Sequence, residues 1–241
     1  MKSNKPPLDG IVAVRTDAAS RKARRADPRP WAGWLTLVLL AWFSFLMLRI
    51  TLQYIPIRTD VAFLQIKQQY LSHDVWKAAF FVHVFTSMFA LAAGFTQFAP
   101  DILRRRPQIH RWMGRLYVLD VALVTGPAGL IMARFANGGL SSRIAFGVLA
   151  VLWIATTAIA WRCVMRRDFV SHREWMIRSY ALTISAVTLR LWKLVLALAL
   201  APNPMDLYRV VAWLGWVPNI LIAEWMIRRM RRGRAGRLGR I

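Results

Sequence analysis

The chain has 241 residues, of which 57% are hydrophobic, and it contains 12 tryptophans but one cysteine. So high an apolar content argues against soluble domains, and a single thiol excludes an intrachain disulfide. The formal net charge of +23 would ordinarily indicate nucleic-acid binding, but the cations lie between apolar runs, which favours a membrane protein instead.

Six apolar runs of about 20 residues are each long enough to cross ~30 Å of hydrocarbon at ~1.5 Å per residue. They lie near residues 31–50, 76–98, 112–135, 143–164, 175–200 and 208–227. Charged residues interrupt the last two runs, namely Arg190, Lys193 and Glu224. The sequence predicts an all-α, polytopic membrane helix bundle of about six transmembrane helices over residues 31–228.

Positive charge alternates between the connections of these helices. Lys and Arg number 8 in residues 1–30, 4 in 99–111, 5 in 162–178 and 7 after Ile227, against 4, 2 and 1 in the alternate connections. Because cytoplasmic loops are enriched in cations, both termini are expected in the cytoplasm of a bacterial inner-membrane protein. Residues 1–30 and 229–241 are then basic cytoplasmic tails, the first disordered, and the basic loops contact membrane lipids, not nucleic acid.

An external segment follows the first predicted helix. In it Phe63, Ile66 and Tyr70 recur at helical spacing behind Asp60. This pattern predicts a short amphipathic helix that lies on the outer surface or caps the bundle.

The second predicted helix carries a polar and small-residue stripe. At 100° per residue one face holds His83, Ser87, Ala90, Gly94 and Gln97. Lipid offers polar groups no partner, so this face is expected to contact protein.

The third predicted helix begins near His110, and its face continues through Gly114, Tyr117, Val121 and Thr125. Asp120 lies off that line but well inside the membrane. Gly126 and Pro127 are expected to kink the outer half. The fifth helix repeats the pattern on one line of residues, namely His172, Ser179, Thr183, Ala186 and Arg190.

A repeated motif relates the third and fifth helices. Arg105–Leu119 and Arg166–Lys193 share, with one residue inserted, His-Arg, Trp-Met and then Arg, Tyr and Leu after a basic segment. Helices two to five therefore form two hairpins related as a parallel repeat, a four-helix core with His110 and His172 facing each other at its inner rim.

These motifs, HRWMGRLY, HREWMIRSYALT with VTLR behind it, and WVPNILIAEW, resemble a bacterial membrane family catalogued as domain of unknown function 2306. The resemblance covers about residues 76–228 and implies a six- or seven-helix inner-membrane protein. It transfers no activity. More remotely, histidines on antiparallel membrane helices are similar in architecture to those of b-type membrane cytochromes.

Two classes of function remain open from the sequence. In the first, two of His83, His110 and His172 hold a b-type haem, Arg111 and Arg173 meet its propionates, and electrons pass to a quinone or another redox partner. In the second the protein is not a redox protein. It is then a carrier of an ion or small solute that uses Asp120, Arg190 and Glu224, or an accessory subunit whose rims contact lipid.

Purely structural roles are the alternative for the same residues. Asp120 and Glu224 could each form an internal ion pair with a rim arginine such as Arg115 or Arg178. Arg190 has no acidic residue at its depth with which to pair. No metal-ion site is predicted, because a denser shell of His, Cys and carboxylate would be needed. The oligomeric state is not indicated.

Overall fold

The computed structural model describes residues 30–98 and 100–238. It contains two units, Met1–Ala41 and Trp42–Ile241. The predicted disordered tail lies almost wholly outside the described residues. Helix α2 (Pro30–Leu52) begins in the first unit. The bundle described below belongs to the second.

Among the described residues, five helical segments are long and apolar enough to cross a membrane, namely Asp74–Gln97, Pro107–Ala133, Gly139–Met165, Phe169–Leu200 and Pro204–Ala235. Ala41–Leu52 is a shorter apolar helix. The five segments match the predicted second to sixth spans, and α2 matches the first. The fold class is therefore as expected, an all-α polytopic bundle.

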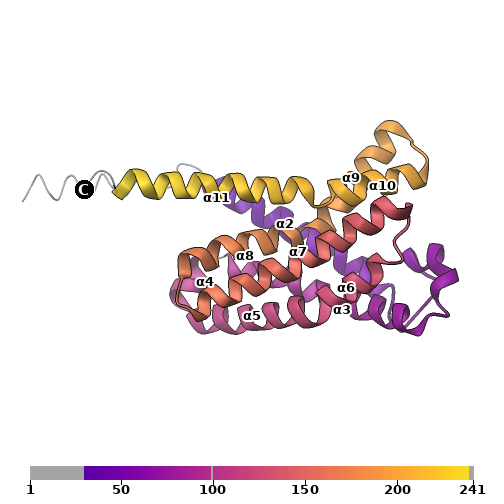
Figure 1. Ribbon diagram of the computed structural model, residues 1–241, viewed down its shortest axis with the longest axis horizontal. Helices are drawn as coiled ribbons and strands as arrows, with labels where there is room; N and C mark the ends of the chain where they lie inside the picture. Colours follow the sequence, from indigo (N-terminus) through magenta and orange to yellow (C-terminus); the bar gives the residue numbers. More distant parts are fainter. Residues whose placement is uncertain (1–29, 99, 239–241) are drawn as a thin grey trace, which may run out of the picture. The chain divides into compact units, whose positions relative to one another are not determined.

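Four spans form the core of the second unit (Figure 1). Helix α3 (Asp74–Gln97) packs against α5 (Pro107–Leu119) and α6 (Gly126–Ala133), α6 packs against α7 (Gly139–Met165), and α7 lies along α8 (Phe169–Thr183). Contacts between α3 and α8 close the arrangement. The predicted core of two hairpins is confirmed.

Interruptions break the third and the fifth of the predicted spans. Between α5 and α6 a π-helical turn, η2 (Asp120–Thr125), ends where the amide of Gly126 donates to the carbonyl of Val121. A Cβ at Gly126 would lie 2.3 Å from that oxygen, so only glycine fits there. The second break, at Ile184, separates α8 from α9 (Ser185–Leu200).

The segment after α2 folds as a 3-10 helix, η1 (Ala62–Tyr70), and packs on the bundle end as a cap. The residues that it buries are Leu64 and Lys67, whereas Ile66 is 59% exposed. The predicted face through Phe63, Ile66 and Tyr70 was therefore wrong in part. A 3-10 helix has three residues per turn, so Leu64 and Lys67 share a face and Ile66 does not.

The last span is divided and longer than expected. Helix α10 (Pro204–Leu214) is followed by α11 (Val217–Leu238), so most of the predicted basic tail 229–241 continues the helix. Helix α11 contacts α8. The short helix α4 (Pro100–Arg105) joins α3 to α5.

Candidate functional site

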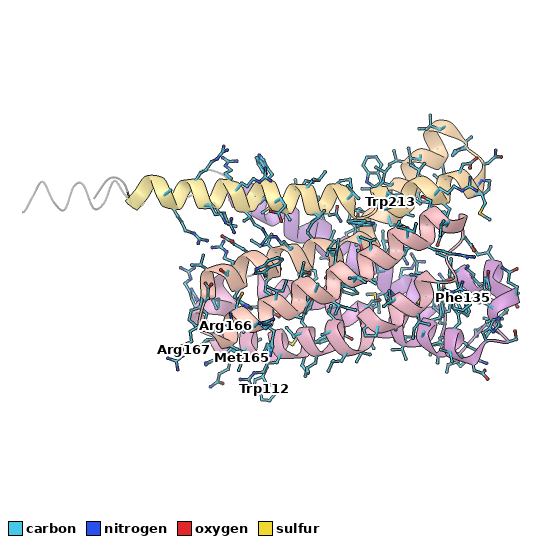
Figure 2. All side chains as sticks on the ribbon, viewed as in Figure 1. Trp112, Phe135, Met165, Arg166, Arg167 and Trp213 are labelled. Atoms are coloured by element: carbon cyan, nitrogen blue, oxygen red, sulfur yellow. The ribbon has the colours of Figure 1, made fainter. Side chains whose placement is uncertain are left out.

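The two histidine motifs begin helices at the same end of the bundle. His110 is the fourth residue of α5 and His172 is the fourth residue of α8, as the repeat predicts. Arg166, Arg167 and Trp112 lie at this end, far from Phe135 (Figure 2). We call this end the basic rim, defined by Arg104–Arg106, Arg111, Arg166, Arg167 and Arg173.

A side-chain cap fixes the start of α8. The carboxylate of Asp168 accepts a hydrogen bond from the Ser171 amide at 3.0 Å, an N-cap interaction that satisfies one of the free donors of the first turn. The Ser171 hydroxyl, and after it the Ser171 amide, hold the pKa of Asp168 below its usual value. Helix α8 therefore has a defined first turn, from which His172 projects.

His172 is held by the neighbouring helix. Its Nδ1 lies 2.8 Å from the carbonyl oxygen of Ala160 in α7. A carbonyl only accepts, so Nδ1 carries the proton and Nε2 keeps its lone pair. This is the arrangement of a metal-ligating histidine, whose second nitrogen donates to a backbone oxygen.

His110 contains a polar atom without a partner. Its Nδ1 is buried and, within the described part of the chain, forms no hydrogen bond. Its own carbonyl accepts from Gln97 Nε2 at 3.0 Å, which ties α5 to the end of α3. His110 and His172 are close enough to interact electrostatically, so the structure brings these two predicted site residues together.

His83 belongs to a different part of the bundle. Its Nδ1 contacts the carbonyl oxygen of Thr125 at 2.9 Å, and its ring lies against Gly129. Gln97, which contacts His110, is about 21 Å further along α3 at ~1.5 Å per residue. The three histidines therefore do not form one site.

A buried polar cluster lies in the middle of the bundle, and the sequence did not predict it as a unit. The Tyr117 hydroxyl contacts Ser179 Oγ at 2.7 Å and Thr183 Oγ1 at 2.8 Å. Trp153 Nε1 donates to Thr183 Oγ1 at 3.0 Å, and Thr157 Oγ1 contacts Ser179 Oγ at 2.6 Å. The cluster joins α5, α7 and α8 through polar bonds that have no competing water in a membrane.

Asp120 opens the π-helical turn and is buried. Its Oδ1 accepts from Thr125 Oγ1 at 2.6 Å, and that hydroxyl lies 2.5 Å from Thr86 Oγ1. Its Oδ2 is buried without a hydrogen-bond partner among the described residues. The ion pair considered for Asp120 does not form in the described structure, where hydroxyl groups surround the carboxyl instead.

The ion pair is confirmed for Glu224. Arg178 holds it through two bonds, Nε to Oε1 at 2.5 Å and Nη2 to Oε2 at 3.0 Å. A second pair, missed from the sequence, joins buried Glu174 to Arg231 at 2.5 Å. Both pairs link α8 to α11 and neutralise the carboxylates, which explains why α11 continues as a helix past Ile227.

Arg190 does not lie on the core face that its spacing predicted. It is exposed, and its Nη1 donates to the carbonyl of Ala186 at 2.7 Å. The predicted line assumed one continuous helix, but the break at Ile184, where Val187 bonds back three residues, shifts the register. Arg190 still lies near His83, as predicted, because its guanidinium acts electrostatically on both His83 and Tyr54.

The family comparison decides the class of protein. The model of the family described as "Predicted membrane protein (DUF2306)" matches residues 80–227, more than half of the chain. The chain belongs to this family. Comparisons with curated proteins and with solved structures give no match. The match runs from α3 into α11, so it includes both histidine-bearing helix starts, and the DUF2306 protein is a membrane protein whose embedded helices contact lipid.

Proposed function

We propose that this DUF2306 protein is a membrane electron-transfer protein with one b-type haem between His110 and His172. The observation that carries the proposal is the state of the two imidazoles. His172 is oriented by the Ala160 carbonyl with Nε2 available, and His110 keeps a buried Nδ1 without a partner. Nε2 of His172 therefore keeps a free lone pair, and Nδ1 of His110 is the nitrogen that the described residues leave unused, while the His110 ring also contacts the Thr96 backbone.

The number of ligands favours haem over a bare metal ion. Protein sites for zinc and similar ions use three or four protein ligands, and no group of three or more His, Cys, Asp or Glu suited to a metal exists among the described residues. A porphyrin supplies four nitrogens, so two imidazoles complete its iron. When bound, haem would supply a one-electron couple at the basic rim.

The surrounding residues set conditions for such a site. A Cβ at Gly114 would lie 3.0 Å from Gln97 Oε1, so that glycine already faces an amide. The cofactor would therefore lie away from Gly114. Arg111 and Arg173 are exposed beside the two histidines and would meet its carboxylates. His83 has no place in the site.

The charge pattern supports an orientation for this proposal. Cations gather at the basic rim and along α11, so the rim faces the cytoplasm of a bacterial inner membrane, with both termini on that side. Electrons then enter or leave through the cytoplasmic leaflet, where a quinone or a soluble redox partner has access.

A second candidate, transport of an ion, is favoured by Asp120. A carboxyl in a π-helical turn with one free oxygen is costly at this depth, by ~2.5 kcal/mol or more when charged, and such residues commonly mark ion or proton paths. Arg190 does not contribute to a site at Asp120, because it lies on the bundle exterior. Glu224 is already paired with Arg178.

A reduced-minus-oxidised absorbance spectrum of the purified full-length protein tests the leading proposal. After expression with sufficient haem, the wild type is expected to show a b-type spectrum. His110→Ala and His172→Ala should each abolish it, whereas His83→Ala, the matched control, should retain it. Gel filtration checks that all variants assemble. Absence of haem from the wild type, or its retention in both rim variants, would refute the proposal, and proton flux that depends on Asp120 in vesicles would then support the second candidate.

A further inference from the structure

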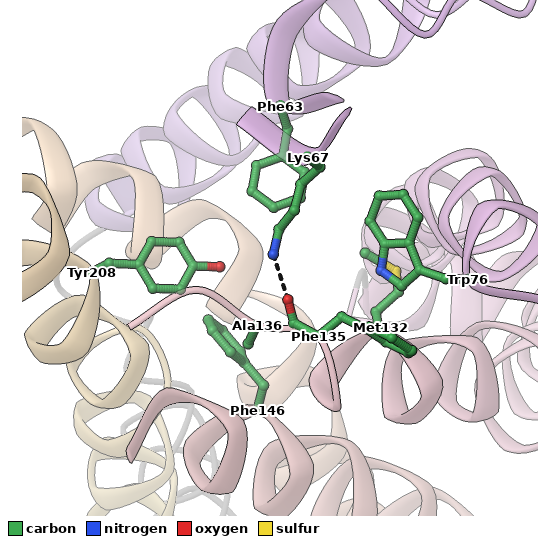
Figure 3. A pocket seen from close by; sticks show the side chains of 8 residues that line it. All are labelled: Phe63, Lys67, Trp76, Met132, Phe135, Ala136, Phe146 and Tyr208. Carbon is green, nitrogen blue, oxygen red and sulfur yellow. Dashed lines mark hydrogen bonds between the residues drawn. The ribbon is translucent and has the colours of Figure 1, made fainter. Parts of the chain in front are cut away.

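The opposite end of the bundle contains a small aromatic pocket (Figure 3). Its volume is ≈ 80 Å³. Five elements or their connecting turns contribute side chains to it, among them Phe63, Trp76, Met132, Phe135, Phe146 and Tyr208. The pocket is separate from the histidine site at the basic rim.

One charged side chain lies inside this apolar pocket. Lys67 is 1% exposed, and its Nζ donates to the carbonyl oxygen of Phe135. The ammonium also lies 4.7 Å from the centroid of the Tyr70 ring and 5.8 Å from that of Phe63, where cation–π attraction compensates part of its lost hydration. Among the described residues, the ammonium therefore contacts one carbonyl oxygen and two ring faces but no carboxylate.

A second cation lies near the first. Burial lowers the pKa of Lys67 to about 8, and the positive charge of Arg143 adds to the effect. Arg143 Nε is itself buried without a hydrogen-bond partner in the described structure. The carboxylates of Asp60, Asp74 and Asp206 are each paired with another cation, namely Arg58, Lys77 and Arg209. Within the described part of the chain, Lys67 therefore has no carboxylate partner.

We propose that the pocket binds a short-chain carboxylate, with the carboxylate group held by the buried Lys67 ammonium and the hydrocarbon end among the aromatic rings. A charge-assisted bond from an ammonium suits a carboxylate. The apolar wall favours an organic anion over a halide, which would leave the rings without a partner. Size sets the upper limit, since one water occupies ~30 Å³ of liquid and the cavity admits a molecule of only a few non-hydrogen atoms.

The proposal has a defined pH dependence. The anion binds the protonated amine, so affinity is retained below pH about 8 and falls above it, by about tenfold per pH unit. The other titratable or charged groups that face the pocket or its lining are Tyr70, His73, Arg143 and Tyr208.

Titration calorimetry with sodium butyrate, on the full chain in a neutral detergent, tests the site. Acetate and chloride provide the size and chemistry comparisons. Lys67→Met is expected to weaken butyrate binding at pH 6.5 at least tenfold, and Lys77→Met, a matched control at the same end, should leave it unchanged. Because Lys67→Met removes a buried contact, the wild-type pH profile provides an independent readout.

Each result decides the proposal. Butyrate binding that weakens in Lys67→Met and, in the wild type, fades above pH about 8 supports it. Absence of butyrate binding by the wild type, equal binding by Lys67→Met, or chloride binding as tightly as butyrate would overturn it. None of these measurements requires haem, so the outcome is independent of the proposed electron transfer.

Discussion

Gly94 and Tyr180 provide a direct test of how the two halves of the core pack. Gly94 lies on the stripe of α3, and Tyr180 is the tyrosine of the second histidine motif in α8. A Cβ added at Gly94 would lie 1.9 Å from Tyr180 Cζ and 2.0 Å from its hydroxyl oxygen. The ring cannot move away without losing contacts, because its hydroxyl donates to the Leu91 carbonyl at 2.9 Å and the residue is only 7% exposed.

The expected cost of Gly94→Ala follows from these contacts. Forcing a methyl group into a packed core costs ~1–3 kcal/mol, and displacing the tyrosine loses an interhelical hydrogen bond worth ~0.6 kcal/mol on average in a membrane protein. The higher helix propensity of alanine over glycine offsets up to ~1 kcal/mol of this cost. The net destabilisation is therefore about 1–3 kcal/mol.

Reversible unfolding in mixed detergent micelles, followed by circular dichroism, measures the effect. Gly147→Ala is the matched control, because nothing lies within 4 Å of a Cβ at Gly147 in α7, and it should be neutral or slightly stabilising. Tyr180→Leu removes the obstructing end of the ring, so Gly94→Ala should cost less in that background. Equal stability of the two alanine variants would show that α8 does not pack on Gly94 as described.

Two further predictions concern charged groups. Glu224→Gln should destabilise the protein by ~1.5–3 kcal/mol, the range for a lost charged hydrogen bond, because Arg178 loses its two-bond partner. The double variant Arg178→Glu, Glu224→Arg restores opposite charges, so its thermal unfolding midpoint should lie above those of the single variants. A double variant no more stable than the single ones would refute the pairing. Lys67 should make stability depend on pH, because its pKa falls from 10.5 to about 8 on folding. The unfolded chain then binds more protons between these values, so wild-type stability relative to Lys67→Met should rise from pH 8 to 10.5, and a flat difference would contradict the burial.

The apolar runs and the repeat predicted the architecture and the rim pair well, because both depend on local patterns. Six runs identified the spans, and the shared motif placed His110 and His172 near the starts of their helices, where each is the fourth residue in the structure. A helix start depends on nearby residues such as Pro107 and Asp168, so it can be inferred from the sequence.

Predictions that assumed one uninterrupted helix of 3.6 residues per turn failed at positions far from the helix starts. The line from His172 to Arg190 crosses the break at Ile184, and the cap assumed 3.6 residues per turn where η1 has three. Such departures are set by packing against other elements, which the periodicity of one segment does not contain. Lys67 was missed for the same reason, since its partner Phe135 is distant in sequence; a lone lysine between Phe63 and Tyr70 in an apolar cap was the available signal.

Helix α8 is held from two sides, and this bears on what its histidine can do. The Ala160 carbonyl of α7 orients the His172 ring, while Arg231 and Arg178 join α8 to α11 through Glu174 and Glu224. A ligand bound at Nε2 would thus meet an imidazole whose orientation is already fixed, which lowers the entropic cost of binding. A purely structural helix start in the headgroup region would need the cations of the rim but not an oriented imidazole. The carbonyl contact at His172, rather than the basic charge around it, is therefore the feature that favours a ligand over a simple lipid contact.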